Sequence, residues 1–188
     1  MKNARELIAF ARARPGQLNF ATAGNGTTAH LAGELFKSMA RVDIVHVPYR
    51  GSPQALLDAV SGQVSLVIAP TLTGLPQVNS GRLRALAVTT PKPSTIAPDV
   101  PTLAEAGLPG YEATLWYGLF APAGTPRGIV VRLSGEVVAI LGLADVRESL
   151  QQQGAEPAGN SPDEFAAFVK SEIAKWAEVV KTSGARAD

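Results

Sequence analysis

The sequence predicts an α/β fold, an open and mostly parallel sheet followed by a helical C-terminal tail. Short apolar runs at 18–21, 44–47 and 64–68 have the length of buried strands. Helical patterns separate these runs, and beyond Pro126 the pattern is almost wholly helical. Strands that alternate with helices at this spacing are typical of βαβ units, whose strands lie parallel.

Capping residues and helix breakers set the boundaries of the expected elements. Asn3 and Glu6 form a capping-box pair at the start of the first helix, and Pro15 ends it. In chain order we expect a helix at 3–14, a strand at 18–21, a helix after 28, a strand at 44–47, a helix from 52, a strand at 64–68, a short helix at 74–79, a strand at 83–88, a short helix at 103–106, a strand at 115–120, and helices at 127–141, at 144–153 and after 161.

Composition argues against several classes of function. With 188 residues, 46% of them hydrophobic and 18% charged, the chain has the composition of a globular protein. The net charge is +1 and Lys and Arg are scattered, so no nucleic-acid partner is expected. The absence of cysteine excludes a thiol nucleophile, and two separated histidines do not make a metal site. We expect no cofactor, no membrane-spanning helix and no signal peptide, since the first residues read as a charged amphipathic helix.

The loop after the first strand is the most informative stretch of the chain. Its glycines allow unusual backbone conformations, and its threonines open a helix. This arrangement presents free backbone N–H groups and the positive end of a helix dipole, which suits a carboxylate or a phosphate. The alternative is a glycine-rich turn that only caps the helix. The candidate ligand-binding residues of the loop are Ala23, Gly24, Asn25, Gly26, Thr27 and Thr28.

Two histidines and a pair of aromatic residues are weaker candidates. His30 lies just inside the helix expected after residue 28, where it could reach a ligand, although a surface or packing role is commoner for such a residue. His46 lies in the middle of the strand expected at 44–47, and we expect it to be structural. Trp116 and Tyr117 could close over a ligand, but core packing is the better default. A small hydrolase or transferase that uses the loop Gly24–Thr28 as an anion hole is the alternative function. The sequence contains no Gly-x-Ser-x-Gly nucleophile turn, which argues against this alternative. We therefore predict that the chain is not an enzyme and has no catalytic residue.

Several motifs in one order resemble a known family. The chain closely resembles the substrate-binding proteins of tripartite tricarboxylate transporters, also called the Bug or TctC family, over essentially its whole length. The matching runs are LNFATAGNGTTAHLAGELF at 18–36, VHVPYRG at 45–51, GRLRALAVT at 81–89, DVPTLAEAG at 99–107, WYGLFAPAGTP at 116–126 and GAEP at 154–157.

The resemblance implies a periplasmic receptor that closes on a small carboxylate and delivers it to membrane subunits of a transporter. It implies a periplasmic-binding-protein-like lobe at 1–120, whose loop at 21–28 holds the ligand carboxylate and whose cleft is lined near Thr71. Members of the family are longer, and this chain resembles the second lobe onward. The helical segment at 121–188 would pack on the first lobe, so its apolar face is also a candidate surface for a homo-oligomer.

Overall fold

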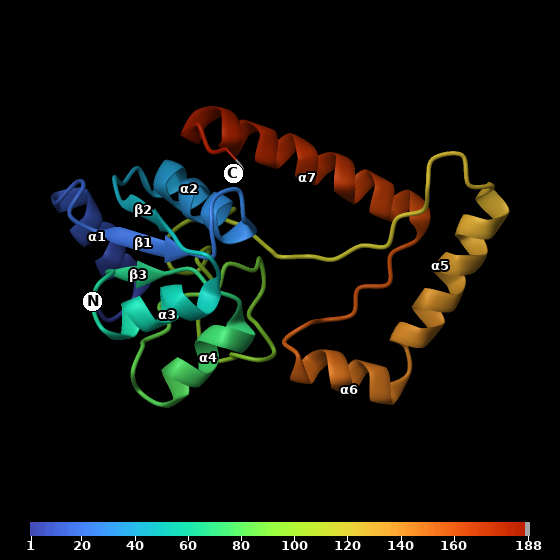
Figure 1. Ribbon diagram of the computed structural model, residues 1–188, viewed down its shortest axis with the longest axis horizontal. Coiled ribbons are helices and arrows are strands. Elements are labelled where there is room, and N and C mark those ends of the chain that lie inside the picture. The colour runs from blue at the N-terminus through green and yellow to red at the C-terminus, as the bar shows by residue number, and fades with distance from the viewer. Residues whose placement is uncertain (187–188) are drawn as a thin grey trace. The chain divides into compact units, whose positions relative to one another are not determined.

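A computed structural model of the chain describes residues 1–186 (Figure 1). The described chain divides into two compact units, one of Met1–Leu115 with the end of the chain from Val179, and one of Trp116–Glu178. The helices are α1 (Ala4–Ala13), α2 (Thr28–Ala40), α3 (Ser52–Val60), α4 (Thr71–Asn79), α5 (Arg127–Leu141), α6 (Ala144–Gln152) and α7 (Pro162–Ser183), and the strands are β1 (Asn19–Thr22), β2 (Val45–Pro48) and β3 (Leu66–Val67).

The first unit is built on a parallel sheet in the order β2-β1-β3, as the sequence predicts (Figure 1). Alternation along β1 sends Phe20 to one face and Ala21 to the other, and both side chains are fully buried. Helix α2 packs on the Phe20 face, where Gly33 approaches the ring. On the opposite face Ala21 packs against Ala55 of α3 and Val64. The two helices therefore cover opposite faces of the sheet.

The close approach of α2 to β1 depends on a glycine. A Cβ placed on Gly33 would overlap Cε2 of Phe20 and would lie 2.5 Å from Cζ. At the preceding residue of α2, the hydroxyl of Tyr111 donates a hydrogen bond of 2.8 Å to the carbonyl of Ala32. Tyr111 is 1% exposed. The position of the helix is thus fixed by its packing on a fully buried ring and by a hydrogen bond from a buried hydroxyl.

The second unit has a core that is largely aromatic. Trp116 meets the rings of Phe165 and Phe168 edge-on, with centroids 5.8 and 5.3 Å away. The buried carboxylate of Glu172 accepts hydrogen bonds from the indoles of Trp116, at 3.1 Å, and Trp176, at 3.0 Å. Because both indole N–H groups find an acceptor, the two half-buried tryptophans leave no indole donor unsatisfied.

Three expected elements are absent from the described residues, and these predictions are wrong. The runs at 83–88 and 115–120 form no strand, because apart from a single bridge between Val88 and Thr102 neither has a partner with which to build a ladder. The segment at 103–106 makes turns rather than a helix. Thr102 and Glu105 do exchange capping hydrogen bonds there, but the turn is not continued.

Candidate functional site

The candidate site lies where two loops meet at the carboxyl edge of the sheet. β1 leads into α2 on one face, and β2 leads into α3 on the opposite face. The adjacent carboxyl ends of β1 and β2 are therefore a topological switch point, the place where open α/β sheets bind ligands. The loops abut there, since a Cβ on Gly24 would lie 3.2 Å from the carbonyl oxygen of Tyr49.

The loop after β1 is held by its own polar groups. Gly24 has a φ of +141° and Gly26 one of +71°, conformations that residues with a side chain rarely adopt. The hydroxyl of Thr27 donates 2.7 Å to the carbonyl of Gly24 and accepts a hydrogen bond of 3.3 Å from the amide of His30. Thr27 is therefore the N-cap of α2 and at the same time closes the loop.

The start of α2 leaves backbone donors available. The amides of His30 and Leu31 are satisfied by the hydroxyl and the carbonyl of Thr27. The amides of Thr28 and Ala29 donate no hydrogen bond within residues 1–186. Two N–H groups and the positive end of the helix dipole thus converge at one point, an arrangement suited to an anion.

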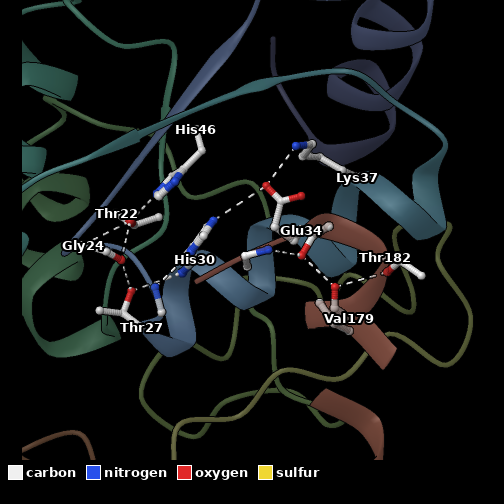
Figure 2. A network of polar contacts seen from close by, with 12 residues as sticks. Thr22, Gly24, Thr27, His30, Glu34, Lys37, His46, Val179 and Thr182 are labelled. Atoms are coloured by element: carbon white, nitrogen blue, oxygen red, sulfur yellow. Dashed lines mark hydrogen bonds and ion pairs between the residues drawn. The ribbon is translucent and has the colours of Figure 1, made fainter. Parts of the chain in front are cut away.

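A pair of stacked imidazoles lies behind the loop (Figure 2). The rings of His30 and His46 are 3.9 Å apart and inclined by 10°. Nδ1 of His30 accepts the amide of Gly26 at 3.1 Å, and Nε2 of His46 lies 2.6 Å from the hydroxyl of Thr22. That hydroxyl also accepts the amide of Gly24 at 3.3 Å. Each ring therefore contacts a different part of the same loop.

Burial lowers the pKa of one of the two imidazoles. Desolvation, with smaller contributions from the positive charges of His30 and Lys37, lowers the pKa of His46 from 6.5 to about 4. Next to the pair, Glu34 is 8% exposed and accepts a hydrogen bond of 2.9 Å from Lys37. Glu34 also lies 3.9 Å from Nε2 of His30. The loop itself carries no basic side chain, so its attraction for an anion rests on amides, hydroxyls and the helix dipole.

The structure brings most of the predicted site residues together. The loop residues are contiguous at the switch point, half-buried apart from the exposed Gly26. His30 is 6% exposed and packs behind the loop rather than facing solvent. Thr71 begins α4 after β3, so it shares the carboxyl edge of the sheet. The sequence predicts only a structural role for His46, and its link to the loop becomes visible through the pairing of β1 with β2.

The fold and the loop define an α/β lobe with a helix N-terminus at its switch point. The family described as the tripartite tricarboxylate transporter family receptor matches residues 1–185, and the chain belongs to this family. The family is one of solute-binding receptors rather than enzymes, in agreement with the prediction that the chain is not catalytic. Its members are periplasmic. No described helix is both long enough and apolar enough to cross a bilayer.

Relatives and solved structures support this membership. The chain is 43% identical, over 93% of its length, to the UPF0065 protein in the tcbD-tcbE intergenic region of Pseudomonas sp. (strain P51), and 39% identical, over 96% of its length, to Protein BugT of Bordetella pertussis. It spans 52% and 55% of those relatives, about half of their length.

Two similar solved structures contain a carboxylate. The structure titled "R. palustris Rpa4515 with adipate" matches with a TM-score of 0.83 and 42% identity, over 98% of this chain and 62% of that one. MatC (Rpa3494) from Rhodopseudomonas palustris with bound malate matches with a TM-score of 0.74 and 34% identity, over 95% of this chain and 62% of that one. These neighbours confirm the predicted periplasmic-binding-protein-like fold.

Proposed function

We propose that this chain provides the lobe of a receptor that binds a small organic carboxylate. The observation that carries the proposal is the pair of available amides at Thr28 and Ala29, at the positive end of α2 and beside the switch point. Adipate and malate in the two neighbours make dicarboxylates the first acids to test. In this proposal the ligand contacts come from Ala23, Gly24, Asn25, Gly26, Thr27 and Thr28, with Thr71 at the same edge and His30 behind the loop.

The proposal extends to the wider setting of the receptor. The bound acid would be handed in the periplasm to the membrane subunits of a tripartite tricarboxylate transporter, as the family description suggests. Residues 1–120 would form the ligand lobe and residues 121–188 the helical segment beyond it. Binding requires no cofactor, because the amides and the helix dipole supply the attraction for the carboxylate.

A thermal-shift measurement tests the proposal. At a hundred times its dissociation constant, adipate or malate should stabilise the protein by about 2.7 kcal/mol, a rise in Tm of roughly 5–10 °C. Adipamide and malamide, in which amides replace the carboxylates, serve as uncharged controls and should give no shift. An equal shift with acids and amides would contradict an anion site, and no shift with any carboxylate would contradict binding by this chain.

A pair of glycine variants tests whether the acid-dependent rise in Tm comes from binding at the loop after β1. Gly24→Ala forces a side chain into a positive-φ position and 3.2 Å from the carbonyl of Tyr49, so we expect the acid-dependent shift to disappear. Gly62→Ala imposes similar backbone strain, at a φ of +77°, with nothing within 4 Å. It should lower the Tm of the free protein and keep the shift. If both variants keep the shift, the loop is not the ligand site.

We also propose that the helical segment mediates self-association. α5 buries none of its residues, and several of its large apolar side chains are about half exposed. Exposed apolar surface of this extent favours association between copies. Light scattering should show an oligomer that the double variant Leu133→Glu and Ile140→Glu converts to a monomer. A monomer at all concentrations for the unmodified chain would contradict this part of the proposal.

A further inference from the structure

We infer that His30 and His46 act as a stacked pair of positioning residues, which fix the loop after β1 so that its amides converge on a carboxylate. This inference rests on the proposed function, and it assigns a role to two side chains that would not themselves touch the ligand. Both rings lie behind the loop, and each bonds to a different end of it (Figure 2).

The first contact fixes the turn at Gly26. Nδ1 of His30 accepts the Gly26 amide at 3.1 Å, so Nδ1 carries no proton and the ring proton resides on Nε2. Nε2 lies on the side of Glu34, 3.9 Å from its carboxylate oxygen. Gly26 stands at a φ of +71°, where its backbone has many competing conformations. The hydrogen bond to His30 selects one of them and holds the residues just before the helix.

The second contact fixes the other end of the loop through Thr22. The Thr22 hydroxyl accepts the amide of Gly24 at 3.3 Å and lies 3.3 Å from the carbonyl of the same residue. Nε2 of His46 lies 2.6 Å away and is the closest hydrogen-bond partner of this hydroxyl. A neutral His46 therefore orients Thr22, and Thr22 orients the amide of Gly24.

Stacking makes the two contacts depend on each other. The rings are 3.9 Å apart, and the ring of His46 also lies 4.9 Å from that of Phe20, which is fully buried. The ring of His46 therefore contacts both the His30 ring and the Phe20 ring, and a shift of either imidazole would disturb the stack. Among the described residues, Glu34 and Lys37 of α2 also lie near the pair, and Lys37 donates a hydrogen bond of 2.9 Å to Glu34.

Hydrogen exchange at single amides tests the inference without any ligand. In His30→Leu the Gly26 amide loses its acceptor, and we expect its exchange to become about tenfold faster. Asn places an oxygen near the position of Nδ1, so His30→Asn should stay within about threefold of the unmodified protein. The amide of Ile68, which bonds to the carbonyl of Ala21 at 3.0 Å in the same sheet, is the internal control and should not change. Equal acceleration of Gly26 and Ile68 would mean a general loss of stability and would overturn the inference.

A measurement on the unmodified protein tests the same hydrogen bond and does not depend on whether the variants fold. A scalar coupling across the hydrogen bond, between the Gly26 amide nitrogen and Nδ1 of His30, should be visible in isotope-labelled protein. Its absence would overturn the inference. His46→Gln, which keeps an acceptor near Nε2, should preserve slow exchange of the Gly24 amide, whereas His46→Leu should accelerate it about tenfold.

Affinity then separates this inference from the proposed function. With adipate as the probe, the dissociation constant should rise about tenfold in His30→Leu and less than about threefold in His30→Asn. If the unmodified protein does not bind adipate but Gly26 exchange responds as expected, the positioning role stands and the proposed function fails. If adipate binds equally well to all variants, the histidines do not position the site, and the inference fails while the proposed function stands.

Discussion

Replacing Gly33 by alanine should destabilise the protein, although alanine is the better helix former. The added Cβ would overlap Cε2 of Phe20 and would lie 2.5 Å from Cζ and 2.9 Å from Cδ2. Phe20 is fully buried in the central strand, so its ring cannot swing into solvent. Either α2 or the ring must therefore shift.

The expected magnitude is a balance of two opposing contributions. Inserting a methyl group into a closely packed core costs about 1–3 kcal/mol, and the value here should lie near the upper end because the obstacle is a rigid ring. The gain in helix propensity from glycine to alanine is about 1 kcal/mol. We expect a net loss in the free energy of unfolding of about 2 kcal/mol for Gly33→Ala.

Urea unfolding followed by far-ultraviolet circular dichroism measures this loss, with the matched control Gly135→Ala. Gly135 lies inside α5, and nothing lies within 4 Å of a Cβ placed there. That variant should be neutral or up to about 1 kcal/mol more stable. Adding Phe20→Leu to Gly33→Ala should recover at least about 1 kcal/mol, because the smaller side chain leaves room for the methyl group. Equal stabilisation by the two alanine variants would refute the reasoning from close packing.

Three further predictions concern polar groups that are buried or half-buried. The pKa of His46, lowered from 6.5 to about 4, means that the unfolded chain binds more protons between these values, so stability should fall as the pH is lowered through that window. Solvent screening limits the loss to about 1–2 kcal/mol, and a Tm series against pH should show it in the unmodified protein but not in His46→Gln. Tyr111→Phe removes the hydrogen bond to Ala32 and should cost about 1–2 kcal/mol in urea unfolding, whereas no loss would mean that water satisfies the carbonyl. Glu172→Ala leaves the Trp116 indole without its acceptor and should cost about 2–3 kcal/mol, measured by tryptophan fluorescence, with Glu172→Gln retaining part of the stability.

Elements that depend on local chemistry were predicted well from the sequence. Helix α5 begins and ends at the expected residues, Arg127 and Leu141, and Asn3 caps α1 by accepting the amide of Glu6. The three strands of the parallel sheet lie within about two residues of their apolar runs. The N-cap of α2 also lies where the pair of threonines indicates, at Thr27. Caps, breakers and periodicity act within a few residues, so a sequence records them directly.

Strands that need a distant partner were not predicted reliably. The segments at 83–88 and 115–120 have strand-like composition, yet no ladder forms on either among the described residues. The buried face of α2 was also only partly predicted. The spacing of Leu31, Leu35 and Phe36 predicts that they share the apolar face. Phe36 is buried, but His30 and Glu34 are buried as well, while Leu31 and Leu35 remain half-buried. The composition of a segment indicates its propensity for strand or helix. Whether it pairs or becomes buried depends on the other segments that pack against it in the folded protein.

The sequence by itself determined the order of the main elements, the parallel α/β class and the glycine-rich loop that leads into a helix between Gly24 and Thr28. Only the tertiary structure decided that His46, on a neighbouring strand, stacks on His30 and supports that loop. The physical reason is the range of the forces involved. A helix N-terminus creates its donors from consecutive residues, but a stacked pair of rings exists only when the register of two strands and the packing of a helix bring separate parts of the chain together.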